Sequence, residues 1–461
     1  IMSKSNRRDF IKITMGGLAA AGLLKHSGGL RSKPILMQVP ERKGSTVMGM
    51  TSKALPTVRI GVIGLGMRGS EAVTRLLQVE GTEIVALCDL LPERVEMAKE
   101  VVRKQRGTEP VGFFSGEEEW EKLCRRDDID LVYICTPWEW HTPMAVDAMR
   151  NGKHAAVEVP AALTIEECWE LVDTSEATRQ HCIMLENCCY DFFELNTLVM
   201  ARRGLFGEIM HAEGAYIHDL RWLKFDEQNG YYPMWRLEYS KFHTGNPYPT
   251  HGLGPIAQIM GINQGDCMEY LTSMSTNQVG MSLYAKETFG PDSKFAKPEY
   301  RLGDMNTTLI RTINGKTMMI QHNTTSPRPY SRIHLISGTK GIAQKYPEER
   351  LAFEPEAHRW LNDKEMKKVM EDNQHPLIKQ IGEKARKVGG HGGMDFIMDY
   401  RLIYCLRNGL SLDETVYDAA TWSSLVELSE ISVKNNGQPV AIPDFTRGEW
   451  EHTPPLGIVT L

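Results

Sequence analysis

Gly64, Gly66 and Gly69 form the pattern G-x-G-x-x-G. Of the motifs in this sequence, this one indicates a known chemistry most clearly. The three glycines follow an apolar run at residues 58–63 and open a helical pattern, the setting in which this motif binds the pyrophosphate of a dinucleotide. The first glycine allows a tight turn, the second lets the backbone approach the phosphates, and the third lets the helix pack on the strand. The sequence therefore predicts a phosphate cradle at the start of this helix.

A carboxylate stands where this kind of site binds the ribose. Asp89 ends the next apolar run, about 20 residues beyond Gly69. Because a carboxylate there binds both ribose hydroxyls and repels a 2'-phosphate, we predict NAD rather than NADP as the cofactor. Arg68, inside the glycine motif, is expected to lie over the adenine or the phosphates.

Two further polar segments follow strand-like runs. Residues 135–141 hold two tryptophans, a glutamate and a histidine after one apolar run, and Glu158 ends the next run. In an open α/β sheet the ligand lies in the crevice outside the carboxyl ends of the strands, so we expect both segments to face it. A structural place in the core is the alternative for the tryptophans and the histidine.

The elements that must position these residues alternate regularly up to about residue 187. Helical patterns separate strand-like apolar runs at residues 58–63, 83–89, 131–135, 154–158 and 182–185. This alternation predicts a doubly wound parallel sheet with helices on both faces, an α/β Rossmann domain over residues 56–187.

Beyond residue 187, strand-like runs follow one another with fewer helices between them, at residues 209–218, 268–275, 307–312, 317–322 and 333–337. Helical patterns at residues 396–406 and 412–434 close the sequence. Such a succession predicts an α+β domain over residues 188–461, built on a large, mostly antiparallel open sheet.

Residues 1–55 are predicted to be a leader and linker. Arg7 and Arg8 precede Phe-Ile-Lys and an apolar run at residues 13–24, which is too short to span a bilayer and resembles a twin-arginine export signal. An uncleaved amphipathic leader is the alternative. We expect export of the folded protein by this route to the periplasm or cell surface of a bacterium, with no membrane span in the mature chain.

Composition and cysteine usage exclude several classes of partner. The net charge is -6, so the chain has no general attraction for nucleic acid or an anionic membrane, and a small neutral ligand is the expected partner. The nine cysteines are scattered and form no CxxC pair, which favours buried free thiols over a disulfide framework. No His/Asp/Glu cluster has metal-ligand spacing, so we predict no metal.

The glycine motif, the segment at 135–141 and Glu158-Val159-Pro160 together resemble the glucose–fructose oxidoreductase and inositol dehydrogenase superfamily, whose members pair a Rossmann domain with an open-sheet substrate domain. Val159 replaces the lysine of that superfamily's Glu-Lys-Pro signature. His251 and Pro255 stand where its dehydrogenases carry an aspartate and a histidine. A plain sugar dehydrogenase is therefore disfavoured.

A narrower resemblance, to the NAD-dependent α-N-acetylgalactosaminidases of glycoside hydrolase family 109, rests on five motifs: Met67-Arg68, the segment from Trp138 to His141, Glu158-Val159-Pro160, the segment from Glu186 to Tyr190, and the segment from Tyr248 to His251. The resemblance implies NAD contacts by Met67, Arg68, Asp89, Trp138, Glu139, Trp140, His141, Glu158, Val159, Asn187 and Tyr248. It implies sugar contacts by Tyr216, Arg236, Tyr248, Pro249, Thr250, His251 and Tyr330.

The resemblance also implies a reaction. A retaining glycosidase of this type oxidises the sugar at C3, eliminates the glycosidic oxygen, adds water and reduces the sugar again, so a tightly bound NAD is regenerated in each turnover. We expect His251 to transfer a proton, because imidazole titrates near working pH. Tyr190 and Tyr248 are expected to relay protons or hold hydroxyls, and Glu158 to orient the nicotinamide ribose or assist a base.

Two other functions remain open. An NAD(P)-dependent sugar oxidoreductase of the glucose–fructose type would reoxidise its cofactor with a second sugar, and a non-catalytic sugar-binding protein would keep NAD for structure. The glycine-rich segment at residues 389–395 is interpreted as a shaped loop near the site or a helix cap. The sequence also leaves a homo-oligomer open.

Overall fold

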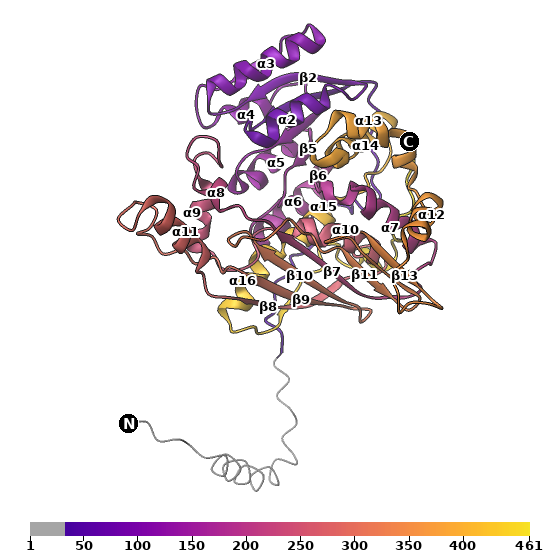
Figure 1. Cartoon of the computed structure of the whole chain (residues 1–461). Coiled ribbons are helices and arrows are strands. Elements are labelled where there is room, and N and C mark those ends of the chain that lie inside the picture. Colours follow the sequence, from indigo (N-terminus) through magenta and orange to yellow (C-terminus); the bar gives the residue numbers. More distant parts are fainter. Residues whose placement is uncertain (1–32) are drawn as a thin grey trace, which may run out of the picture. The chain divides into compact units, whose positions relative to one another are not determined.

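The computed structural model describes residues 33–461, and the predicted export signal lies outside the described residues. The N-terminal part is a six-stranded parallel sheet in the order β3-β2-β1-β4-β5-β6 (Figure 1). Its strands are β1 (Val58–Ile63), β2 (Thr82–Cys88), β3 (Val111–Phe113), β4 (Leu131–Ile134), β5 (His154–Val157) and β6 (Cys182–Met184). Its helices are α2 (Met67–Leu76), α3 (Pro92–Arg106), α4 (Glu119–Cys124), α5 (His141–Arg150) and α6 (Ile165–Thr178). The predicted Rossmann fold is confirmed.

Local signals in the sequence explain the boundaries of these elements. The strands β4, β5 and β6 are buried throughout, as expected of a sheet covered on both faces. Pro92 opens α3, and the left-handed Gly107 ends it. Thr164 and Glu167 form a capping box that starts α6. The sequence patterns did not predict β3 and α4, because both are short and lie among charged residues.

The C-terminal part contains an eight-stranded sheet in the order β13-β12-β11-β7-β10-β9-β8-β14. Its strands are β7 (Ile209–Ile217), β8 (Met268–Ser275), β9 (Asn306–Thr312), β10 (Thr317–Asn323), β11 (Leu335–Gly338), β12 (Gly341–Gln344), β13 (Arg350–Phe353) and β14 (Val440–Ala441). Only β7 and β10 pair in parallel, so the prediction of a mostly antiparallel sheet is confirmed.

More helices occur in this part than the sequence patterns predicted. They are α7 (Phe192–Arg202), α8 (Arg221–Lys224), α9 (Trp235–Phe242), α10 (Thr250–Met260), α11 (Gly280–Phe289), α12 (Asp363–Asp372), α13 (Pro376–Val388), α14 (Met394–Asn408), α15 (Val416–Ser423) and α16 (Leu425–Lys434). The predicted helix at 412–434 is thus two helices, which meet at Ser424.

Two facing glycines hold α10 close to the sheet. A Cβ atom on Gly214 in β7 would lie 2.1 Å from the carbonyl oxygen of Gly252 in α10, so any side chain at Gly214 would force the helix away from the strand. This close approach fixes the first turn of α10, which carries His251, against the end of β7, which carries Tyr216. The fold thus positions two of the predicted site residues.

The predicted linker needs a correction in the part that the structure describes. Ile35 forms a parallel bridge with Val440, and Arg42 donates to Glu449 over 2.9 Å. Val47 is 4% exposed. Residues 35–55 therefore run along the body of the protein and are fixed to it at a few points, with Val47 and Met50 buried and Leu36 exposed. Local patterning does not reveal such single buried side chains. Within residues 33–461 no helix is both long enough and apolar enough to cross a membrane.

We predict that Arg75→Met lowers the free energy of unfolding by about 3–5 kcal/mol, because it leaves the buried carboxylate of Asp399 without its cation. Arg75 in α2 donates to Asp399 over 2.9 Å and lies 3.5 Å from Asp395, both in α14. Urea unfolding measures the change. The matched control, Arg103→Met, removes an exposed ion pair and should barely move the midpoint; equal shifts would contradict the prediction.

Candidate active site

The glycine motif forms an open cradle at the start of α2. Gly64 has a φ of +86°, and a Cβ atom on Gly69 would lie 1.7 Å from the carbonyl oxygen of Gly64, so the turn and the helix packing both need glycine. A Cβ atom on Gly66 would meet only Arg94, at 3.6 Å. No side chain caps the first turn of α2, which leaves its N–H groups free. This geometry fits the pyrophosphate of NAD.

Asp89 lies beside this cradle. Its carboxylate accepts hydrogen bonds from the backbone N–H groups of Leu65, at 2.6 Å, and Leu91, at 2.9 Å. Arg94 stands 3.7 Å from the same carboxylate. The backbone contacts hold Asp89 at the carboxyl end of β2, the place that the ribose-binding role requires.

Arg68 ties the cradle to two carboxylates. Its guanidinium donates to Glu158 at the end of β5 and to Asp395 in α14, with N–O distances of 2.8 Å in both cases. Asn187 donates to the other oxygen of Asp395. Burial raises the pKa of Asp395, but Arg68 and His391 outweigh it and hold this pKa well below its usual range. Two predicted NAD contacts, Arg68 and Asn187, therefore both bond Asp395, and a third, Glu158, pairs with Arg68.

The glycine-rich loop before α14 presents a second histidine. Gly389, Gly390, Gly392 and Gly393 all have positive φ values, a run that only glycine adopts without strain. His391 lies among them, with Nδ1 at 3.0 Å from Asp395 and 3.2 Å from Arg68. Its side chain is 54% exposed. The sequence predicted a shaped loop near the site or a helix cap here but no role for His391, although a histidine among four glycines was the available signal.

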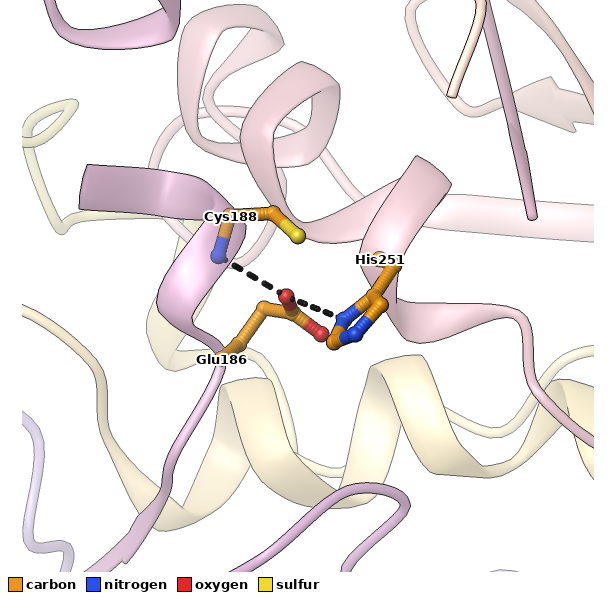
Figure 2. Close-up of side chains that lie close together, drawn as sticks. All are labelled: Glu186, Cys188 and His251. Carbon is orange, nitrogen blue, oxygen red and sulfur yellow. Dashed lines mark hydrogen bonds and ion pairs between the residues drawn. The ribbon is translucent and has the colours of Figure 1, made fainter. Parts of the chain in front are cut away.

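His251, in the first turn of α10, is held by Glu186. Its Nδ1 lies 2.7 Å from Glu186, and its Nε2 lies 3.4 Å from the hydroxyl of Tyr248. Figure 2 shows the carboxylate of Glu186 between the His251 ring and the backbone N–H of Cys188, which donates over 3.1 Å. A carboxylate bound to Nδ1 places the ring proton there and leaves Nε2 free to accept a proton.

The charge state of Glu186 follows from the same contacts. Glu186 is fully buried, and burial raises its pKa, but the charge and hydrogen bond of His251 outweigh this and lower it. An ionised Glu186 stabilises a protonated His251, as the carboxylate does in a catalytic triad. The sequence predicted no role for Glu186, although it opens one of the five motifs of the resemblance.

Arg236 packs against an aromatic cluster that contains several of the predicted sugar contacts. Its guanidinium lies 4.8 Å from the ring centre of Trp138 and 5.1 Å from that of Tyr248. The ring of Tyr216 lies 4.6 Å from Tyr248 and 6.2 Å from Tyr330. Since Trp138 follows β4 of the Rossmann domain, the cluster joins that domain to the C-terminal part of the chain.

Burial controls the pKa of the tyrosines in this cluster. Burial raises the pKa of Tyr248 well above its usual value; Arg236 opposes the rise, and Glu158 and Glu186 add to it. The Tyr248 hydroxyl therefore stays protonated, as a donor that can pass a proton on to His251. Pro249 and Thr250 stand at the start of α10, the helix that carries His251, and Thr250 is fully buried.

Several predicted residues lie away from this arrangement or point elsewhere. The hydroxyl of Tyr190 donates to Asp413 over 3.4 Å, in a buried pair that does not contain His251. His141 places both ring nitrogens against backbone carbonyls, of Pro160 at 2.7 Å and of Thr136 at 2.8 Å, which gives its ring a structural role. Glu139 is exposed, and Trp140 packs on Trp120. Val159 is buried, and Met67 is 43% exposed at the start of α2.

Glu186, Cys188 and His251 could together hold a metal ion, because their ligand atoms lie within 4.8 Å of one another. The geometry favours a hydrogen-bonded pair of Glu186 and His251 over a metal site. Glu186 and His251 already bond each other, and burial raises the pKa of Cys188 well above its usual value, so its thiol keeps its proton.

We therefore predict that extensive dialysis against EDTA leaves the catalytic activity unchanged. Elemental analysis of the dialysed protein serves as the control that divalent metals have been removed. Activity that disappears on chelation and returns with one divalent ion would show that the three residues form a metal centre.

Comparisons with known proteins agree with this geometry. Residues 58–186 match the family described as "Oxidoreductase family, NAD-binding Rossmann fold", and residues 190–452 match "Glycosyl hydrolase 109, C-terminal domain". The chain is 54% identical over 407 residues to an alpha-N-acetylgalactosaminidase of Bacteroides fragilis, which covers 88% of this chain and 96% of the relative. It is 46% identical over 463 residues to one of Shewanella oneidensis, which covers 99% of this chain and 100% of the relative.

Solved structures support the same fold. Levoglucosan dehydrogenase in complex with NADH and levoglucosan superposes with a TM-score of 0.62 at 18% identity, covering 84% of this chain and 100% of that one. Scyllo-inositol dehydrogenase from Lactobacillus casei, with NAD(H) and scyllo-inositol, gives a TM-score of 0.58 at 15% identity, covering 84% of this chain and 99% of that one.

The fold and the site define an NAD-binding enzyme of the glycoside hydrolase class. The chain belongs to glycoside hydrolase family 109. The NAD-dependent glycosidase is thus favoured over the sugar oxidoreductase and over the non-catalytic sugar-binding protein.

Proposed function

We propose that this protein is a retaining α-N-acetylgalactosaminidase that keeps NAD tightly bound and regenerates it in each turnover. The names of the relatives from Bacteroides fragilis and Shewanella oneidensis support the sugar and the anomer. The observation that carries the proposal is the pair of His251 and Glu186 beside Tyr248, within a chain that also forms the dinucleotide cradle. An aromatic cluster with one arginine suits a neutral sugar ring, which aromatic faces and a few donors bind.

NAD held in the cradle of Gly64, Gly66 and Gly69 would supply the hydride acceptor for oxidation at C3 and the hydride donor for its reversal. Tyr248 and His251 take the proton of the sugar hydroxyl: the Tyr248 hydroxyl passes its proton to Nε2 of His251, and Glu186 stabilises the resulting imidazolium. The same imidazolium gives the proton back when the hydroxyl is restored. The ion pair of Arg68 with Glu158 fixes both side chains where they would hold the nicotinamide ribose.

Elimination needs a base for the C2 proton and an acid for the glycosidic oxygen. The ketone at C3 acidifies the C2 proton, so a modest base is sufficient. His391 suits the acid role, because its ring is half-exposed on a glycine-rich loop and faces the Arg68 and Asp395 cluster rather than the core. Its Nδ1 is held by Asp395 and Arg68, so the other ring nitrogen is the one that can meet a leaving oxygen.

Export and assembly belong to the same proposal. We propose that the twin-arginine route exports the folded protein, with NAD already in its cradle, to the periplasm or cell surface of a bacterium. All nine cysteines of the chain lie within the described residues as free thiols, which suits folding in a reducing compartment before export. Met274 and Leu309 are 70% and 53% exposed on the open sheet. Exposed apolar side chains of this kind suit a contact between two subunits.

A panel of 4-nitrophenyl glycosides tests the proposed function. The purified protein should release nitrophenol from the α-N-acetylgalactosaminide, and less from the β-anomer and from the α-N-acetylglucosaminide. NMR of the first-formed sugar should show the α-anomer. Absence of hydrolysis, together with a change in NADH absorbance when free sugars are added, would point instead to a sugar oxidoreductase.

A further inference from the structure

The C-terminal part of the chain reaches the dinucleotide cradle through α14, which packs against α2 and β1 of the Rossmann domain (Figure 1). Arg68 lies in the first turn of α2, and Asp395 lies in the first turn of α14, 327 positions further along the chain. Nη1 of Arg68 lies 2.8 Å from Oδ2 of Asp395. A residue from outside the Rossmann domain is therefore bonded to a predicted NAD contact.

The side chain of Arg68 crosses the edge of the sheet where a dinucleotide lies. The strand order β3-β2-β1-β4-β5-β6 reverses between β1 and β4, and ligands of such sheets lie outside the carboxyl ends at this point. Arg68 follows β1, whereas its partner Glu158 follows β5, on the far side of β4. The guanidinium of Arg68 therefore stands in the crevice, and its position decides how it meets a bound dinucleotide.

Asp395 is the buried partner of this guanidinium. Its side chain is fully buried, whereas that of Arg68 is 27% exposed. Asn187 donates to Oδ1 of Asp395, and the guanidinium of Arg75 lies 3.5 Å from Oδ2. Because Asp395 is fixed by partners of its own, it is a rigid acceptor that holds Arg68 in one place.

Close packing of the backbone keeps Asp395 in position as well. A Cβ atom on Gly390, in the loop before α14, would lie 2.7 Å from Cβ of Asp395 and 2.9 Å from Cδ of Arg75. Gly390 also has a φ of +81°, so both its conformation and its surroundings require glycine. The loop thus leaves Asp395 no room to move away from its partners.

A competing partner for Arg68 lies on the surface. The carboxylate of Glu71, one turn further along α2, lies 3.9 Å from Nη1 of Arg68, and its side chain is 59% exposed. An arginine side chain has several staggered rotamers, and its contacts select among them. Without Asp395, Glu71 would compete with Glu158 for the guanidinium and draw it out of the crevice.

We propose that the C-terminal part of the chain completes the NAD site, with Asp395 as the positioning residue that holds Arg68 in the crevice. Asp395 acts through Arg68 and does not itself touch the dinucleotide. It thereby accounts for the tight NAD binding of the proposed function, on which this role rests. Since a coupling between two sites is reciprocal, bound NAD in turn stabilises the docking of α14 on α2.

The rate of NAD release tests this role without any sugar. Protein loaded with radiolabelled NAD is mixed with excess unlabelled NAD, and filtration reports the label that remains bound. Asp395→Asn keeps the shape of the side chain and the oxygen that accepts from Asn187, but removes the charge that holds Arg68. The release rate should rise by about 10- to 100-fold, the effect of losing a charge-assisted hydrogen bond.

Asp413→Asn is the matched control, because it also breaks a buried ion pair of α14. Asp413 lies 2.9 Å from Arg401 of that helix, and their side chains are 5% and 6% exposed. Arg401 also donates to the carbonyl of Thr460, and Asp413 accepts from Tyr190, so this pair ties α14 to other segments than α2. The control should release NAD within about threefold of the wild-type rate. Equally fast release from both variants would overturn the proposal.

Combination with Arg68→Met shows whether Asp395 acts through Arg68. Arg68→Met alone should accelerate NAD release, because the arginine itself is expected at the dinucleotide. Adding Asp395→Asn to Arg68→Met should then change the release rate by less than about twofold. Effects of the two substitutions that multiply would mean that Asp395 acts by another route, and the proposed role would be wrong.

A measurement on the wild-type protein does not depend on any variant folding. Amide hydrogen exchange is compared between the NAD-loaded and the NAD-free protein. By the reciprocal coupling, NAD should slow exchange in α14 as well as in α2, while exchange in the remote α16 stays the same. Protection of α2 without protection of α14 would overturn the coupling.

Failure of this role and failure of the proposed function give different results. Faster NAD release from Asp395→Asn than from the control, in a protein that hydrolyses no glycoside, would support the role and contradict the glycosidase. Release at the wild-type rate from a folded Asp395→Asn protein that hydrolyses the glycoside would overturn the role alone. A wild-type protein that binds no NAD would contradict both.

Discussion

Replacing His251 with phenylalanine is expected to lower kcat by about 100- to 10,000-fold, the usual contribution of a positioned acid–base group. Phenylalanine keeps the ring that packs on Tyr216 and Tyr248 but removes both nitrogens. The proton of the sugar hydroxyl then has no imidazole to receive it, while the aromatic packing is retained. Steady-state kinetics with the 4-nitrophenyl α-N-acetylgalactosaminide measure the change.

The content of bound NAD in purified His251→Phe protein is the control, because His251 does not line the dinucleotide cradle. It should equal that of the wild-type protein. Glu186→Gln should also lower kcat, though less, because glutamine can still hold Nδ1 of His251 but cannot stabilise the imidazolium by charge. A His251→Phe protein that retains NAD and turns over within about tenfold of the wild-type rate would remove His251 from the mechanism.

Replacing Gly66 with leucine is expected to abolish NAD binding while leaving the fold intact. Gly66 has a φ of -70°, which other residues adopt, and a Cβ atom there meets only the tip of Arg94. The unfolding free energy of the NAD-free protein should therefore change by no more than about 1 kcal/mol. The new side chain would occupy the space in which the backbone meets the pyrophosphate, so the Kd for NAD should rise by about 100-fold or more.

NAD released on denaturing the purified protein, and titration of the NAD-free protein, measure this effect. Gly457→Leu is the matched control, since a Cβ atom on Gly457 meets nothing within 4 Å and the carbonyl of the preceding Leu456 accepts from Arg202 of α7, in the C-terminal part. It should keep both NAD and activity. Should Gly66→Leu protein retain wild-type affinity for NAD, the dinucleotide would have to bind elsewhere.

Local patterns were sufficient for most of the Rossmann domain and its cradle. Gly64, Gly66, Gly69 and Asp89 form a site whose parts lie close together in sequence, so their spacing carries the geometry. The strands around them are apolar runs of ordinary length. Short elements were missed: β12 and β13 have four residues each, too few for a clear alternation.

The partners of the site residues could not be predicted because they come from distant parts of the chain. The sequence places His251 at a helix start but does not show that Glu186, 65 positions earlier, bonds its ring. Asp395 is 327 positions from Arg68. Tyr190 shows the opposite error: it belongs to the same motif as Asn187, but the tight 3-10 turn that holds both directs its hydroxyl to Asp413.

The central claim, that the glycosidic bond breaks by oxidation and elimination, is tested most directly by hydrolysis in heavy water. The 4-nitrophenyl α-N-acetylgalactosaminide is incubated with the purified protein in D2O, and proton NMR of the released sugar reports the hydrogen at C2. Removal of the C2 proton and its return from solvent predict deuterium at C2 in the product, while unreacted substrate keeps its hydrogen. Release of sugar that retains hydrogen at C2 would contradict the account and indicate direct displacement at C1.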